Sequence, residues 1–171
     1  MRSFLLMVLA GAAWRAQAQP DTLYVPQGDT TYALAVVYDT PEVAEQYKLI
    51  GRYAHDTSAV AVQLGMKRGK PSGVYRAFFP DGRPLIFAVY GYGSLHGDWT
   101  EYDELGRVII KGQYRDGLRD GPWAFRREGV RGKYRKGLRH GKWRYYEHKR
   151  LVRTEKWRDD KLLPGRGGLF R

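Results

Sequence analysis

The amino-acid sequence predicts a mainly β protein: an elongated antiparallel sheet of stacked β-hairpin repeats with a small α+β cap at its N-terminus. Three observations support this prediction: a recurring pair of glycines, a large aromatic residue at a fixed position after each pair, and turn sequences between short runs of β-forming residues. The 171-residue chain has 21 glycines and 14% aromatic residues, a composition that favours strands and turns over a helical bundle.

The first 18 residues have the pattern of a secretory signal peptide. Arg2 precedes an apolar run from Phe4 to Trp14, and an A-x-A cleavage site follows at residues 16–18. The apolar run is shorter than the roughly 20 residues that a membrane-spanning helix needs. We therefore expect export to the periplasm or the extracellular space. Because the sequence has no cysteine, we expect neither disulfides nor a cysteine-linked lipid anchor.

Residues 19–66 show no repeat and are expected to form the N-terminal cap. The alternation over Thr31–Tyr38 predicts a strand, and Ala59–Leu64 predicts another that leads into the repeats. Between them, Thr40–Glu42 combines a capping hydroxyl, a proline and an acid, which predicts a short helix up to Ile50 that Gly51 ends. We expect this cap to protect one open end of the sheet.

Residues 67–157 contain about four copies of one repeat, in which two glycines four residues apart are followed two residues later by a large aromatic side chain. The copies are Gly69/Gly73/Tyr75, Gly93/Gly97/Trp99, Gly117/Gly121/Trp123 and Gly137/Gly141/Trp143. A turn and a second β-forming run complete each copy, the second runs being Leu85–Tyr90, Val108–Tyr114, Val130–Tyr134 and Leu151–Trp157. A glycine-bearing turn reverses the chain tightly, and one hairpin cannot hide its own apolar face, so neighbouring copies are expected to stack.

The segments GLRDGPWAF and GLRHGKWRYY resemble the MORN repeat, particularly its variant in bacterial exported proteins and in antitoxin-like relatives. The resemblance extends over roughly Gly69 to Trp157. It implies one twisted antiparallel sheet with an aromatic-lined groove, and a binding or scaffolding role towards membrane lipid or protein. The copies depart from the pattern at Tyr75, which replaces Trp, in the shortened third copy, and in the missing turn glycine of the fourth.

The repeated aromatic residues are expected to form a shared core, because large rings bury more surface than other side chains. The alternative is a partly exposed groove on which a ligand stacks. Both interpretations concern the same four residues, Tyr75, Trp99, Trp123 and Trp143.

The sequence offers no catalytic or metal-binding constellation. His96 and His140 occupy the same repeat position, but equivalent positions in adjacent copies should lie about 10 Å apart, too far for one ion. There is no G-x-S-x-G motif, and Gly91–Gly93 lacks the Lys-Ser/Thr of a phosphate loop. We therefore expect a protein that is not an enzyme and that has no cofactor.

Charge divides the chain into two unequal halves. Residues 19–106 contain 7 basic and 11 acidic residues, whereas residues 107–171 contain 21 basic and 7 acidic ones. A basic half of this kind attracts anionic partners, although a solvated face that keeps the protein soluble has the same composition. The candidate binding residues are Arg115, Arg119, Arg126, Arg127, Arg131, Arg135, Lys136, Arg139, Lys142 and Arg144, with Lys133, Lys149, Arg150 and Arg153 near them. Residues 158–171 are expected to form a flexible basic tail.

Two functions follow from these observations. The first is a protein-interaction or scaffolding module of the cell envelope, and the alternative is a peripheral binder of anionic lipid or other polyanions through the basic repeats. Nucleic acid has similar electrostatics but is disfavoured by export. The sequence indicates neither the partner nor the oligomeric state.

Overall fold

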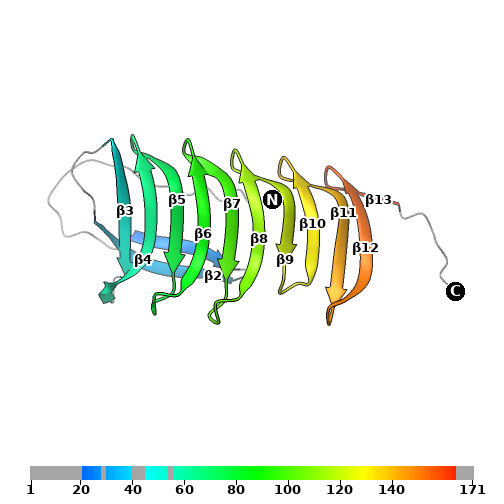
Figure 1. Cartoon of the computed structure of the whole chain (residues 1–171), viewed down its shortest axis with the longest axis horizontal. Helices are drawn as coiled ribbons and strands as arrows, with labels where there is room; N and C mark the ends of the chain where they lie inside the picture. Colours follow the sequence, from blue (N-terminus) through cyan, green and yellow to red (C-terminus); the bar gives the residue numbers. More distant parts are fainter. Residues whose placement is uncertain (1–20, 28–29, 40–44, 54–55, 165–171) are drawn as a thin grey trace.

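In the part of the chain that the structure describes, thirteen strands follow one another in a single antiparallel sheet, each hydrogen-bonded to the next strand along the chain (Figure 1). The computed structural model describes residues 21–27, 30–39, 45–53 and 56–164, with side chains from residue 45 onward. No residue in these ranges is helical. The same ranges hold no helix that could span a membrane. The prediction of a mainly β protein of sequential antiparallel hairpins is confirmed.

The strands pair in chain order from one end of the sheet to the other. The first six are β1 (Asp21–Gln27), β2 (Thr30–Asp39), β3 (Gln46–Tyr53), β4 (Asp56–Lys67), β5 (Lys70–Phe78) and β6 (Pro84–Gly91). The remaining seven are β7 (Ser94–Tyr102), β8 (Val108–Arg115), β9 (Leu118–Phe125), β10 (Val130–Arg135), β11 (Leu138–Glu147), β12 (Arg150–Arg158) and β13 (Lys161–Leu163).

The two glycines of each repeat pair have different structural roles: the first lies in a turn and the second in a bulge. In the β8–β9 hairpin, Asp116 and Gly117 form a two-residue turn in which both φ angles are positive, 52° and 77°, as the right-handed twist of a hairpin favours. Gly121, with φ 73°, then lies in a bulge, because Lys111 pairs with Ala124 whereas Gln113 pairs with Asp120. The bulge therefore lies in β9 just before the repeat aromatic.

The two-residue turns are linked along one long edge of the sheet, the upper edge in Figure 1. The amide of Gly117 donates to the carbonyl of Leu95 at 2.8 Å, and the amide of Gly137 donates to the carbonyl of Arg119 at the same distance. Each turn therefore hydrogen-bonds to the strand that follows the preceding turn, which satisfies backbone groups that a loop would leave to water.

The face of the sheet that carries the repeat aromatics is called here the aromatic face. Tyr75 pairs with Ala88, Ala88 with Trp99, and Trp99 with Gly112, so large and small residues alternate across the strands. A Cβ atom on Gly112 would lie 2.2 Å from Cδ2 of Trp123, and the same holds for Gly132 and Trp143. These two strand glycines therefore make room for the indole rings that cross them.

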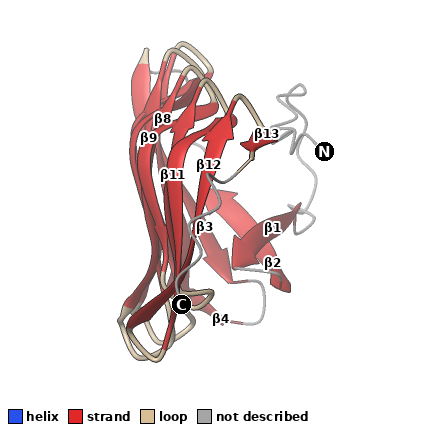
Figure 2. Ribbon diagram, turned by 90° about the vertical axis from the view of Figure 1, so that its right-hand side faces the viewer, coloured by secondary structure: helices blue, strands red, loops and turns tan. Residues whose placement is uncertain are grey.

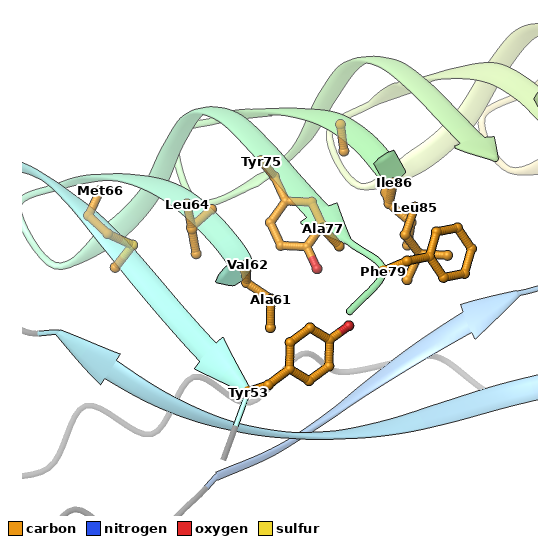
Figure 3. Packing of buried hydrophobic residues seen from close by; sticks show 11 residues of the cluster. Tyr53, Ala61, Val62, Leu64, Met66, Tyr75, Ala77, Phe79, Leu85 and Ile86 are labelled. Atoms are coloured by element: carbon orange, nitrogen blue, oxygen red, sulfur yellow. The ribbon is translucent and has the colours of Figure 1, made fainter. Parts of the chain in front are cut away.

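Two clusters of buried side chains lie on this face. The apolar cluster comprises Tyr53, Ala61, Val62, Leu64, Met66, Tyr75, Ala77, Phe79, Leu85, Ile86 and Ala88. Figure 3 shows it on the side of the sheet where the β1 and β2 ribbons cross, and Figure 2 shows these two strands standing off that side. The aromatic cluster comprises Ile109, Ile110, Trp123, Tyr134 and Trp143, and Trp99 packs against both clusters.

The helix predicted from Thr40 to Ile50 is wrong over the residues that the structure describes. Gln46–Tyr53 is a strand, β3, which pairs with β4 through contacts such as Leu49 opposite Leu64. Residues 40–44 lie outside the described residues. Sheet pairing and burial of Tyr53 (2% exposed) outweigh the local capping pattern, because intrinsic propensity is a weak prior. The expected α+β cap is therefore all β where it is described.

The other strands predicted from the sequence correspond to observed strands. The predicted signal peptide and part of the predicted tail lie outside the described residues. The strands predicted at Thr31–Tyr38 and Ala59–Leu64 correspond to β2 and β4, and each second run of the repeats lies in β6, β8, β10 or β12. Residues 1–18, the expected signal peptide, lie outside the described residues. The expected tail begins at the end of β12 and includes β13, and residues 165–171 are not described.

Candidate anion-binding face

Basic side chains gather on the face of β8–β12 that lies opposite the aromatic face. Successive side chains of a strand point to opposite sides, so residues next to the indoles and strand glycines face away from them. Arg131 and Lys133 flank Gly132, and Lys142 and Arg144 flank Trp143. We call this the basic face and define it by seven residues: Lys111, Arg126, Arg131, Lys133, Lys142, Arg144 and Lys156.

Like charges lie directly opposite one another on this face. Arg131 pairs with Arg144 between β10 and β11, and Lys142 pairs with Lys156 between β11 and β12. Side chains that face each other across antiparallel strands have Cβ atoms about 4.5–5.5 Å apart, where like charges are destabilising. The arrangement therefore raises the free energy of the folded protein unless a counter-charge occupies the face.

None of the seven basic-face residues forms an ion pair with another described residue. Some basic residues outside this set do form ion pairs. Arg115 lies 3.9 Å from Asp120, Arg135 lies 2.9 Å from Asp159, and Arg153 lies 3.3 Å from Glu155. Three arginines outside the basic face are thus paired with acids, whereas no basic-face residue has an acidic partner among the described residues, and the Arg131 guanidinium lies 5.6 Å from the ring centroid of Tyr146.

A hollow of about 600 Å³ lies in the basic face. Small side chains and glycines form its floor along and beside β9: Gly112, Pro122, Ala124 and Gly132. Six of the seven basic-face residues line it, all except Lys156, and Asp98 is the one carboxylate in the lining. Asp98 accepts a hydrogen bond from Nε2 of Gln113 at 3.0 Å, so it marks the β7 end of the hollow.

Arg119 and Arg139, two of the predicted binding residues, lie on the aromatic face instead. The Arg119 guanidinium lies 4.6 Å from the ring centroid of Trp123, and that of Arg139 lies 5.0 Å from Trp143 and 4.8 Å from Trp157. Burial alone would lower the pKa of Arg119, but its contacts with the Tyr114 and Tyr134 hydroxyls raise that pKa overall. Both arginines cover aromatic rings through cation–π contacts.

The remaining predicted binding residues lie on the rims of the sheet. Arg127 is exposed in the turn between β9 and β10, and Lys136 occupies the two-residue turn before β11 with φ 51°. Arg115 and Arg135 stand at strand ends next to their acidic partners. Hydrogen bonding to Arg135 lowers the pKa of Asp159, which keeps this carboxylate charged. The structure therefore brings together four of the ten candidates, Arg126, Arg131, Lys142 and Arg144.

Sequence reasoning missed two members of the basic face, Lys111 and Lys156. Strand alternation could have found both, since Lys111 lies next to Gly112 and Lys156 next to Trp157. The same rule applied to Trp123 and Trp143 would have placed Arg119 and Arg139, each four residues earlier, on the aromatic face. Position along the chain alone does not separate the cations of the two faces.

The repeat aromatics are packed inside the sheet's aromatic face. Trp123 and Trp143 are each 2% exposed, Tyr75 is buried, and Trp99 is half-buried. Their indole nitrogens are satisfied internally: Nε1 of Trp123 donates to the carbonyl of Gln113, and that of Trp99 donates to Glu101. These rings therefore shape the sheet and leave little surface for a ligand to stack on.

The repeated histidines stabilise the turns that follow them. Nδ1 of His96 lies 3.2 Å from Asp116, and Nδ1 of His140 lies 3.3 Å from Asp159, both acids being in two-residue turns. At the equivalent position, Asp120 accepts a hydrogen bond from the amide of Lys136. Within the described ranges, no group of three or more His, Cys, Asp and Glu side chains could hold a metal ion.

Comparison with known proteins assigns neither a family nor a function to this chain. Neither the protein-family models nor the curated proteins searched contain a match to this chain. The resemblance to MORN repeats therefore depends on the glycine and aromatic spacing alone, and membership of that family stays a prediction.

Proposed function

We propose that this protein is a non-catalytic interaction module of the cell envelope and that its basic face docks an anionic partner. The observation that carries the proposal is the pair Arg131 and Arg144, which lie opposite each other without an acidic neighbour. Like charges in that position cost stability, so their presence is best accounted for by a partner that supplies the missing negative charge.

The chemistry of the face suits oxyanions. Guanidinium groups present donors in a fork that matches phosphate and carboxylate oxygens, and ammonium groups add point charges around them. The basic face contains both kinds, with Arg126, Arg131 and Arg144 among the lysines. The hollow gives an oxyanion access to several of these groups at once.

The proposal is tested by binding to probes that differ only in charge. The mature chain should co-sediment with vesicles of phosphatidylglycerol, or bind polyglutamate or polyphosphate, at low salt and not at high salt, whereas neutral vesicles should not bind it. An Arg131→Glu/Arg144→Glu variant should lose this binding and keep its intrinsic tryptophan fluorescence. Failure to bind any anionic probe at low salt would contradict the proposal.

A second candidate function, docking of a partner strand, is favoured by the edge of β12, most of which is unpaired among the described residues. Only Lys156–Arg158 of this nine-residue strand pair with β13, and Leu151 and Val152 are 54% and 52% exposed. An open edge with apolar side chains is a template for strand addition. Val152→Lys should then abolish capture of a specific envelope protein that the Arg131→Glu/Arg144→Glu variant still captures. Equal capture by both variants would exclude this edge.

A further inference from the structure

The cations of the basic face are spread along the sheet and do not converge on one point. Lys111 belongs to β8 and Lys156 to β12, four strand spacings apart, which corresponds to about 19 Å at roughly 4.8 Å per strand. A single phosphate or carboxylate group cannot reach both ends. A ligand that uses the whole face must carry several negative charges over a length similar to this distance.

The register arranges most of these cations in two rows that run across the strands. Lys111 aligns with Ala124, Arg131 and Arg144 in one row, because each pairs with the next. The second row is interrupted by the bulge of β11: Lys142 pairs with Lys156 on β12, whereas Lys133 on β10 pairs with Pro122 on one side and with His140 on the other. Rows two residues apart along a strand are separated by about 6.7 Å. A narrow chain can therefore lie between two rows of positive charge.

The floor of the hollow sets the position of this track. Both positions of β9 that lie in the two rows are small, Ala124 and Pro122, while the neighbouring strands carry Lys111 on one side and Arg131 and Lys133 on the other. The ligand can thus sink between cations that contact it from the sides. Asp98 on β7 ends the track, since its carboxylate would repel an anion that continued in that direction.

These features favour a chain over a lipid surface. A bilayer presents a plane, which would touch only the tips of side chains that surround a hollow, and peripheral binding is strengthened by apolar side chains that insert. The one large apolar residue lining the hollow, Trp123, is 2% exposed. The hollow therefore has the layout of a groove for a polymer, and no exposed large apolar side chain lines it.

We infer that the basic face binds a linear polyanion with phosphate groups along its length, which lies in the hollow across β8–β11 and continues to Lys156 on β12. This inference rests on the proposed function and specifies its partner. Phosphate is the group that both the arginine forks and the lysine ammonium groups bind well, and a repeated phosphate matches cations repeated on successive strands.

The test uses end-labelled linear polyphosphate, in one length that spans the face and one much shorter, with fluorescence anisotropy as the readout. Lys111→Gln and Lys156→Gln, at opposite ends of the track, should each weaken binding of the long chain about two- to tenfold. Neither should change binding of the short chain by a comparable factor. Arg127→Gln, which removes one exposed charge from a turn outside the hollow, is the matched control and should have little effect.

Salt dependence supplies an independent measure of the contacts. Each phosphate contact to a flexible strand should contribute about 0.7 to the slope of log affinity against log salt, so each end variant should reduce that slope by about this amount for the long chain. The Arg127→Gln control should leave the slope unchanged.

Three results would overturn the inference. In the first, only one end variant affects long-chain binding. In the second, polyglutamate of the same length binds as tightly as polyphosphate. In the third, phosphatidylglycerol vesicles bind and polyphosphate does not, in which case docking of an anionic partner stands and the linear polymer is wrong. A protein that binds no anionic probe contradicts both proposals together.

Discussion

The strands β4–β6 and β8–β11 use the same hairpin to bury an apolar face in two different ways. Around β4–β6 the core contains small aliphatic residues, with Ala61, Ala77 and Ala88 fully buried, and the β1–β2 strands cross over that side (Figure 2). Around β8–β11 the core consists of Trp123 and Trp143 lying over Gly112 and Gly132. The first region is covered by a second layer of chain, and the second is covered by its own side chains.

The aromatic cluster shows how the sheet buries apolar surface around β8–β11, where no second layer of chain is described. Trp123 stacks with Phe125 at 5.7 Å, meets Tyr134 edge-on at 5.9 Å, and carries the Arg119 guanidinium above it. Wide rings cover one another along the sheet, and the guanidinium groups of Arg119 and Arg139 cover the rings in turn. The arginines of the basic half thus serve the core on one face and binding, as proposed, on the other.

The largest expected effect is loss of a central indole. Trp123→Ala should lower the free energy of unfolding by about 3–5 kcal/mol, because it removes a ring that is 2% exposed and leaves a cavity over Gly112. Urea denaturation followed by circular dichroism measures this change. A loss below about 1 kcal/mol would mean that the ring packs weakly and that the two regions do not differ as described.

The next largest effect concerns the strand glycines that distinguish the two regions. Gly132→Ala should destabilise the protein by about 1–3 kcal/mol, because its new Cβ would meet the ring of Trp143 at 2.2 Å. Ala88 occupies the corresponding position between Tyr75 and Trp99 and already carries a Cβ, so Ala88→Gly should cost only about 0.5–1 kcal/mol. Equal effects in thermal denaturation would contradict the proposed fit between glycine and indole.

Most of the fold could be predicted from the glycine and aromatic spacing. Gly117 and Gly121 specify a turn and a bulge four residues apart, and this local pattern recurs without depending on distant contacts. The helix predicted before Gly51 failed for the opposite reason. The residues at Thr40–Glu42 resemble a helix start locally, but Leu49 and Tyr53 belong to a strand whose stability comes from β4. Nothing in the segment itself reveals that partner.

The composition of the candidate site was predictable, and strand alternation could have given the face of each cation, but the hollow was not predictable. The excess of arginine and lysine after Arg107 is visible in the sequence. Whether Arg119 covers an indole or joins Arg131 on the other face depends on the alternation of each strand, which the bulge preserves by adding two residues. The hollow depends on small residues of β9 lying beside cations of β8 and β10, a relation that only the sheet register establishes.

A smaller effect is expected from the arginine that covers the aromatic cluster. Arg119→Ala should lower the free energy of unfolding by about 0.5–2 kcal/mol, since the guanidinium lies within 6 Å of Trp123, Phe125 and Tyr134. Arg127→Ala, an exposed turn residue, should stay within about 0.5 kcal/mol of the wild type. If both variants lose the same stability, general charge and not ring coverage explains the effect.

The smallest expected effect has the opposite sign and tests why the basic face exists. Arg144→Glu places an acid opposite Arg131, which turns a repulsive cross-strand pair into an attractive one and should raise the free energy of unfolding by about 0.2–1 kcal/mol. Arg144→Gln removes the repulsion without adding attraction and should give a smaller gain. Both variants should bind polyphosphate more weakly than the wild type. A gain in stability together with a loss of binding is the pattern expected when residues are retained for a partner at the expense of the fold. If both variants are less stable than the wild type, Arg144 contributes to the folded sheet itself, and the opposed charges no longer argue for an anionic ligand.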